Sequence, residues 1–277
     1  MKKLIIFLYF VFLLLFSIFS YAFVDPNLSY LKSIYSGFIF SNRFLTTVLY
    51  ILFILIFFIF YGIFAWLGIR KKLQFNDALL LLGITVGTLF ISYPAMLSYD
   101  IFNYITTSKV LFFYHENPYI IMPIEFTGDP FLSFTHAANK IALYGPFWIF
   151  LTGIPYFLGF GNFIIVFFSF KFVVAIFYLA TVFLIWKISK NIISVLLFSF
   201  NPLVIIETLI SGHNDIVMMF LVLFSFFLLM RKKIVFSIVF FLLSIAIKYA
   251  TLFLLPLFVF LLWKSFRKKS INWEKTF

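Results

Sequence analysis

Continuous apolar runs separated by short polar breaks dominate the sequence. The runs are about 20 residues long and do not alternate, so they predict membrane-spanning helices rather than the strands of a barrel. The first runs cover residues 4–23, 44–67 and 78–97, and Asn76-Asp77 suits an N-cap for the helix at 78–97.

The second half of the chain continues the pattern. Further helices are predicted over residues 162–186, 191–210, 215–230, 234–247 and 250–263. The predicted fold class is therefore all-α. We expect a single integral membrane domain over residues 1–277, built as a polytopic helix bundle with about eight crossings.

The first run also has the features of a signal peptide, with Ser20-Tyr21-Ala22 as a small-x-small cleavage site. Its apolar stretch is longer than a usual signal-peptide core, so an uncleaved helix is the preferred interpretation. Both alternatives place Asp25-Pro26 on the outer side of the membrane.

Residues 98–161 interrupt the series of long runs and predict a long outer loop. Apolar residues recur at helical spacing from Ile101 to Phe113, which predicts an interfacial helix ended by Asn117-Pro118. The later run at 146–160 is short and contains Gly153 and Pro155, so we interpret it as an interfacial or re-entrant segment.

The distribution of basic residues supports this topology. If 146–160 crossed the membrane, Arg231-Lys232-Lys233 and the tail at 264–277 would lie outside, against the positive-inside rule. If it does not cross, 15 of the 21 Lys and Arg residues lie inside. We therefore expect a multi-pass cell-membrane protein with both termini and the basic tail in the cytoplasm, and with 98–161 as an outer catalytic loop.

Composition agrees with a membrane protein. The chain is 65% hydrophobic and 11% charged, unlike a soluble domain. Its net charge of +12 raises nucleic acid as a partner, but basic cytoplasmic loops explain the charge, so no nucleic acid is predicted and membrane lipids are. The absence of cysteine excludes disulfides and thiolate chemistry.

Asp100 follows the third predicted helix and stands on the outer side. We predict acid/base chemistry there; the alternative is that Asp100 caps the interfacial helix. Most of the polar residues of the region surround it in sequence, including Asn103 and Tyr104.

The same topology brings other polar residues to the outer face. His213 and Asp215 occupy an outer turn, and Lys248 the next one. The alternatives are that His213 is a solvated loop residue, that Asp215 caps the helix that follows it, and that Lys248 snorkels to lipid headgroups. Lys171 lies within a predicted helix, where a charge needs a polar cavity or a partner such as Glu207. Carboxylates and histidine can bind a divalent metal, but no ligand spacing enforces one, so neither a metal nor another cofactor is predicted.

Several motifs occur in order over about 92–256. They are Asp100 with Tyr104, Asn117-Pro118-Tyr119, Tyr144-Gly145-Pro146-Phe147-Trp148, Asn201-Pro202-Leu203 with Glu207 and His213-Asn214-Asp215, and Lys248 with Pro256. Together they resemble GT-C superfamily membrane glycosyltransferases, and most closely the polyprenol-phosphate-mannose-dependent α-mannosyltransferases of prokaryotic envelopes.

The resemblance implies an inverting transfer of a sugar, expected to be mannose, from a polyprenyl-phosphate donor to a glycan or lipid acceptor on the non-cytoplasmic face. Asp100 is then the predicted general base. Lys248, His213 and Lys171 are predicted to bind the donor phosphate. Sugar or acceptor contacts are predicted for a further set: Asp215, Asn214, Tyr104, Tyr144 and Trp148.

The chain is shorter than the family it resembles, whose members carry further C-terminal helices. The expectation is a compact variant, a fragment, or one half of a split enzyme that works with a second membrane subunit. Two other functions remain as alternatives: a polyprenyl-lipid flippase or transporter, which should show an inverted repeat, and a non-catalytic subunit.

Overall fold

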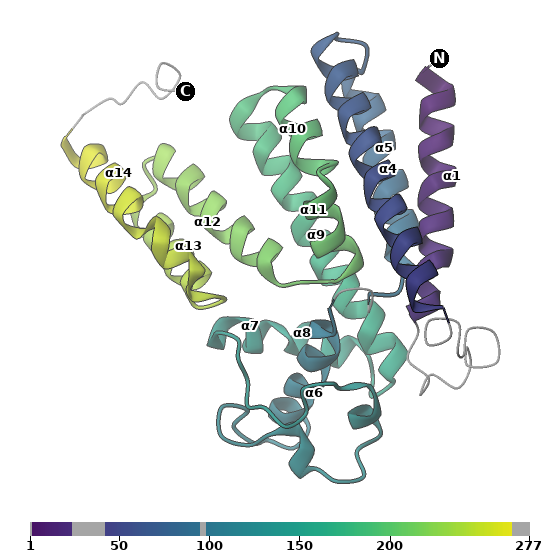
Figure 1. Ribbon diagram of the computed structural model, residues 1–277. Coiled ribbons are helices and arrows are strands. Elements are labelled where there is room, and N and C mark those ends of the chain that lie inside the picture. The colour runs from purple at the N-terminus through teal and green to yellow at the C-terminus, as the bar shows by residue number, and fades with distance from the viewer. Residues whose placement is uncertain (1, 24–41, 95–97, 268–277) are drawn as a thin grey trace.

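The computed structural model describes residues 2–23, 42–94 and 98–267 (Figure 1). All regular secondary structure in these ranges is helical, which confirms the all-α prediction. Residues 24–41, with the Asp25-Pro26 expected on the outer side, and the end of the basic tail lie outside the described residues.

Apolar helices form one side of the bundle. They are α1 (Lys2–Ser20), which continues into η1 (Tyr21–Phe23), α4 (Arg43–Ile69), α5 (Phe75–Phe90) and α9 (Phe163–Ser189). Only 11% of the most apolar window of α4 is fully buried in the protein, so a large part of its apolar surface is left uncovered, as expected for a helix in contact with lipid.

Helix α5 differs from the prediction at both ends. It begins after Gln74, whose N–H donates to the Asp77 carboxylate at 2.8 Å, so Asp77 lies in the first turn rather than at the cap. It ends at Phe90 rather than 97, because the chain leaves the helix before Tyr93-Pro94 and proline disfavours a helical residue before it.

The helix predicted over 191–210 is broken. It consists of α10 (Ile192–Ser199), α11 (Pro202–Val204) and the π-helix η4 (Ile205–Ile210), with a bend of 54° at the break. Pro202 cannot donate to the preceding turn, and the Asn201 side chain accepts from the Leu203 N–H at 2.9 Å to start the second piece. The bend redirects the chain toward the polar end of the bundle.

The remaining bundle helices are α12 (Asp215–Met230), α13 (Ile234–Ile245), η5 (Tyr249–Leu254) and α14 (Leu255–Arg267). Helix α12 packs against α13 and α9. The final helix, predicted over 250–263, starts as the 3-10 helix η5 and becomes α-helical at Leu255.

Short helices of the predicted outer loop gather at one end of the bundle (Figure 1). They are α6 (Asp100–Phe112), η2 (Pro123–Glu125), η3 (Pro130–Phe134), α7 (Pro146–Leu151) and α8 (Gly153–Leu158). The helix expected after residue 100 is confirmed as α6. The run at 146–160 forms two short helices separated at Thr152, not one long helix.

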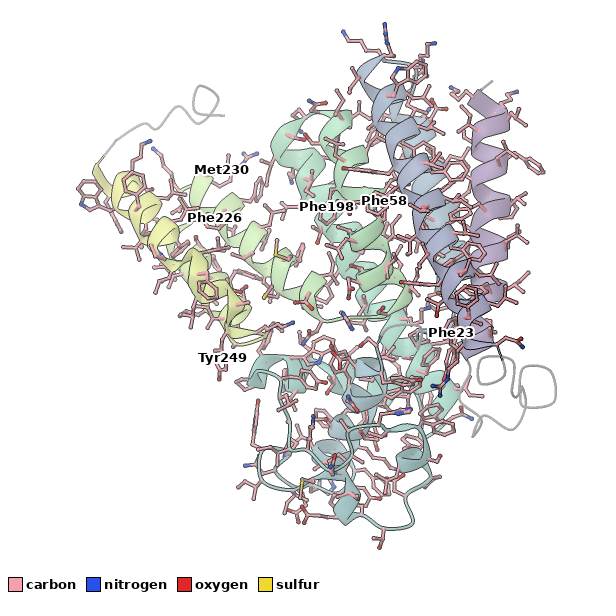
Figure 2. All side chains as sticks on the ribbon, viewed as in Figure 1. Phe23, Phe58, Phe198, Phe226, Met230 and Tyr249 are labelled. Atoms are coloured by element: carbon pink, nitrogen blue, oxygen red, sulfur yellow. The ribbon has the colours of Figure 1, made fainter. Side chains whose placement is uncertain are left out.

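The two ends of the molecule differ in charge. The N-terminus and the end of α14 lie at the end opposite α6, α7 and α8 (Figure 1). Met230, just before Arg231-Lys232-Lys233, lies toward the N-terminal end of the bundle, whereas Tyr249 lies near α7 (Figure 2). The described basic clusters are thus separated from the short helices.

The protein is a polytopic membrane helix bundle. Among the described residues four helices are long and apolar enough to cross a membrane, or five if the bent pair α10–η4 counts as one. Helices α5, α12 and α13 are apolar but shorter. The count of about eight crossings needs all of them to span and stays a prediction.

Candidate functional site

Asp100 opens α6 at the polar end of the bundle. Tyr99 is the N-cap, and the Asp100 N–H donates to the Ser98 hydroxyl at 3.2 Å. The Asp100 side chain is 43% exposed, and its carboxylate lies in the first helical turn, where the helix dipole favours negative charge. The carboxylate is therefore fixed in place by α6 and still accessible to a ligand.

His213 lies between three oxygen-bearing side chains. Its Nδ1 is 2.5 Å from Oε2 of Glu207, and its Nε2 is 2.7 Å from the Ser98 hydroxyl and 3.8 Å from Oδ2 of Asp100. The loop returns on itself here, because the His213 N–H also donates to the Glu207 carbonyl at 2.9 Å. This cluster joins α6 to the turn between η4 and α12.

The contact with Glu207 determines what His213 can do. A carboxylate only accepts hydrogen bonds, so Nδ1 carries the proton and Nε2 faces Ser98 and Asp100. In the neutral ring Nε2 accepts from the Ser98 hydroxyl, and in the protonated ring it donates. Glu207 is positioned by the π-helix η4, and π-helical turns recur at functional sites.

Gly212 lets the loop approach α6. Its φ is +71°, and a Cβ atom there would lie 3.0 Å from Cδ1 of Ile101. Any larger residue would carry both the left-handed strain and this contact. The glycine before His213-Asn214-Asp215 thus has a clear structural role.

Asp215 and Lys248 form an ion pair beside this cluster. Lys248 Nζ lies 2.8 Å from Oδ1 of Asp215, and the two side chains are 51% and 41% exposed. Asn214, between His213 and Asp215, is buried, and its N–H reaches the Tyr104 hydroxyl at 3.5 Å. Contacts therefore connect α6, the 211–214 turn, α12 and the start of η5.

Tyr104 and Trp148 belong to the core beneath the site. Each is only 1% exposed. The Tyr104 ring packs edge-on against the rings of Tyr144 and Trp148, with ring centroids 4.7 and 5.1 Å apart. The prediction that these two rings stack on a sugar needs correction, because neighbouring side chains cover both. Burial raises the pKa of Tyr144 above its ordinary value, and the Asp100 carboxylate raises it further, so its hydroxyl remains a donor.

The Tyr144-Gly145-Pro146 motif docks against the break that presents Lys248. The Gly145 N–H donates to the Ile247 carbonyl at 3.0 Å, and the Phe147 N–H donates to the Ala246 carbonyl at 3.0 Å. A Cβ atom on Gly145 would lie only 2.2 Å from the Ala246 oxygen. The motif therefore serves to join the segment that leads into α7 to the α13–η5 turn.

Asn117-Pro118-Tyr119 supports the same junction. The Tyr119 hydroxyl donates to the Tyr144 carbonyl at 2.7 Å, and the Ala142 N–H donates to the Pro118 carbonyl at 2.7 Å. These bonds tie the loop at 117–119 to the segment that leads into α7.

Lys171 lies elsewhere. It is 3% exposed, and its Nζ donates to the carbonyl oxygens of Leu89 and Ser92, at 3.0 and 2.5 Å, and to the Ser92 hydroxyl at 3.1 Å. It forms no ion pair with Glu207, which instead pairs with His213. The ammonium group satisfies acceptors at the end of α5, so we do not assign it to the donor phosphate.

Sequence patterns do not single out Ser98, and they suggest the wrong partner for Glu207. The available signals are the Ser98-x-Asp100 spacing and the position of Glu207 six residues before His213. Among the residues that the structure describes, no group of three or more His, Asp or Glu side chains is arranged to hold a metal ion.

A known protein family matches the chain. Its model, described as the N-terminal domain of alpha-(1->6)-mannopyranosyltransferase, matches residues 8–264 and so covers nearly all of the described helices. No curated protein and no solved structure matches the chain.

Proposed function

The chain belongs to the MptA/B family of alpha-(1->6)-mannopyranosyltransferases, a polyprenol-phosphate-mannose-dependent family, and from this premise we propose how it transfers mannose. In this proposal the mannosyl group moves from polyprenyl-phosphate mannose to a glycan or lipid hydroxyl, with inversion, on the non-cytoplasmic face. The family is one of glycosyltransferases, so the transporter alternative is set aside. The match is to an N-terminal domain, and a partner subunit remains a prediction.

The contact between Asp100 and His213 carries the proposal. In an inverting transfer the acceptor oxygen forms a bond to the anomeric carbon while its proton passes to a base. The bond from that carbon to the phosphate oxygen breaks, and its electron pair leaves with polyprenyl phosphate. Asp100 is the proposed base, because its carboxylate is exposed, anchored on α6 and close to the donors that a phosphate needs.

Lys248 and protonated His213 are the proposed phosphate ligands. The leaving phosphate gains negative charge in the transition state, and positive donors placed there stabilise it. Lys248 is about half exposed and is oriented by Asp215, so its ammonium can reach a ligand without leaving its partner. His213 is oriented by Glu207 and points Nε2 toward Asp100. Tyr144 is partly exposed and remains a proposed sugar contact, whereas Asn214 is buried like Tyr104 and is not assigned to the sugar.

An apolar groove suits the polyprenyl chain. It has an empty volume of about 840 Å³ and lies between the end of α6 and the helices α7 and α8. Its lining is apolar: Phe112, Phe150, Leu151, Gly153, Ile154, Phe157 and Leu158. We propose that 146–158 lies at the membrane interface and receives part of the donor lipid.

The basic clusters at the opposite end support the orientation. Positive residues tend to collect on the cytoplasmic side, and this tendency supports an outer position for Asp100 and the short helices. The direct test is an assay of the purified chain in nanodiscs, with polyprenyl-phosphate mannose, the matching glucose donor and a mannoside acceptor. We expect transfer from polyprenyl-phosphate mannose and none from the glucose donor. No transfer from either donor by correctly folded protein would contradict the proposal.

A further inference from the structure

A large apolar crevice opens at the basic end of the bundle. Its empty volume, which is partly open to the surroundings, is about 1610 Å³, nearly twice that of the groove beside α7 and α8. The crevice lies between the junction of α9 and α10, helix α12 and helix α14, at the end of α12 where Figure 2 labels Met230. None of its lining residues belongs to the candidate site, so it needs a separate explanation.

The crevice combines apolar walls with a polar mouth. Its walls come from apolar residues of α12 and α14, such as Leu223 and Leu257. The turn between α9 and α10 forms its polar part, where Lys190 lines the crevice together with its neighbours Ser189 and Asn191. Lys190 is exposed, so its ammonium group is accessible to a ligand.

Further cations lie around the same opening. Lys187 Nζ and Arg231 Cζ lie 5.6 and 5.3 Å from the centroid of the Phe227 ring, so α9 and the end of α12 bring positive groups to one place. Arg231 directly follows the lining residue Met230. Lys264 lies on α14, one helical turn beyond the part that lines the crevice. Positive groups from three helices thus gather where the crevice opens.

These cations have no carboxylate partners. No ion pair joins Lys187, Lys190, Arg231 or Lys264 to an acidic side chain within the described ranges. The described carboxylates lie in residues 100–129 and 207–215, apart from Asp77, which pairs with Lys2 at 2.8 Å. Positive charge that the protein does not balance attracts an anion, and basic pockets between membrane helices on the cytoplasmic side bind anionic lipid headgroups.

We propose that the crevice binds an anionic phospholipid of the cytoplasmic leaflet, with an acyl chain between α12 and α14 and the phosphate beside Lys190. Such a lipid matches both parts of the surface, because its acyl chain covers the apolar walls and its phosphate accepts from the cations. An apolar membrane helix in the same place would leave those cations unbalanced. The inference uses the proposed orientation of the bundle but does not depend on mannose transfer.

Native mass spectrometry of the full chain tests the headgroup contact, using micelles that contain phosphatidylglycerol or a phosphatidylcholine with the same acyl chains. Wild type should retain phosphatidylglycerol in preference, and Lys190→Gln should weaken this retention about fivefold, the size of one lost lysine contact to an anionic lipid. Lys71→Gln is the matched control, expected to behave as wild type. Lys71 is also exposed, its φ is +55° against +52° for Lys190, and it does not line the crevice.

Three results of this experiment would overturn the proposal. They are equal retention by wild type and Lys190→Gln, an equal loss in Lys190→Gln and Lys71→Gln, and equal retention of the two lipids by wild type. The second result would show a general attraction to positive charge, and the third would show that only the acyl chains are bound.

A second pair of variants tests the apolar walls. Leu257 lines the crevice and is 49% exposed, so Leu257→Trp adds bulk there without entering the buried core. Retention of phosphatidylglycerol should fall severalfold. Val259→Trp, at a 51% exposed position of α14 outside the lining, should retain the lipid as wild type does. Unchanged retention in Leu257→Trp would show that the lipid does not enter the crevice and would contradict the proposal.

Competition separates this site from the donor lipid. Polyprenyl phosphate added in equal amount should leave phosphatidylglycerol bound to wild type. Its displacement would assign the crevice to the polyprenyl chain and overturn the inference. No sugar donor is present in these measurements, so retention that depends on Lys190 and Leu257 supports the lipid site even if mannose transfer fails.

Discussion

Oδ2 of Asp100 lies 3.8 Å from Nε2 of His213, although the two residues come from distant parts of the chain. The Asn201-Pro202 break and the π-helical turn bring His213 back to the first turn of α6. This relationship places an exposed carboxylate beside a histidine whose other nitrogen is already held by Glu207.

Asp100→Asn should lower kcat for mannose transfer by about 10²–10⁴-fold, because the amide cannot accept the acceptor proton. Initial rates with saturating donor and acceptor measure the effect. Glu116→Gln is a matched control, since it makes the same chemical change at an exposed loop position and is expected to keep wild-type rates. Near-wild-type kcat in Asp100→Asn would remove Asp100 as the base.

Glu207→Gln should lower kcat by roughly 10–100-fold with little change in donor KM. The glutamine amide can still contact the ring, but it no longer requires a proton on Nδ1, so Nε2 loses its defined role. The tautomer and protonation state can be followed by ¹⁵N NMR of labelled histidine. An unchanged His213 spectrum together with unchanged kcat would show that Glu207 does not position the ring.

Lys248→Met should raise the KM for polyprenyl-phosphate mannose about tenfold, because a charge-assisted contact to phosphate is lost while the apolar stem is kept. Lys248→Arg should restore part of the affinity. Lys3→Met, an exposed lysine on α1, controls for the general loss of positive charge. If both methionine variants raise donor KM equally, the effect is a nonspecific attraction and not a phosphate contact.

Gly145→Ala should destabilise the protein by about 1–3 kcal/mol and reduce transfer, because the new methyl group meets the Ala246 carbonyl backbone. Thermal unfolding in detergent gives the stability change. Gly83→Ala is the matched control, since its position in α5 is helical and has no atom within 4 Å of the added Cβ, so no loss is expected. Equal melting temperatures for both variants would contradict the junction between Gly145 and the α13–η5 turn.

The sequence allows much of the fold to be predicted, because apolar length alone indicates the helices. It does not reveal where an apolar stretch stops being helical: the residues after Phe90 remain partly apolar, yet Tyr93-Pro94 ends the regular structure. Pro202 was an available signal for the broken helix. Residue type and the order of the helices predict which polar turns meet. They are less informative about where each helix bends or ends.

The candidate site is also only partly predictable from the sequence. A shared outer face predicts that Asp100 and His213 meet, and the structure brings them together. Sequence cannot tell which aromatic rings are covered, so Tyr104 and Trp148 look like stacking platforms although both are buried. Lys171 donates to backbone carbonyls at a helix end. Every residue type carries such a carbonyl, so the sequence does not indicate these partners.

Lys171→Met tests whether that lysine is structural. Its ammonium group is buried and bonded to oxygens at the end of α5, so methionine should leave these acceptors without a donor and destabilise the protein by roughly 1–3 kcal/mol. Thermal unfolding should show the loss, while donor KM for the folded fraction stays within about twofold of wild type. Lys248→Met should show the reverse, with a raised donor KM and little change in stability. A raised donor KM in Lys171→Met, with unfolding unchanged, would instead show that this lysine reaches the phosphate during the reaction. Since its partners hold the end of α5 just before the segment that leads to Asp100, that outcome would also require this end of α5 to open when donor binds.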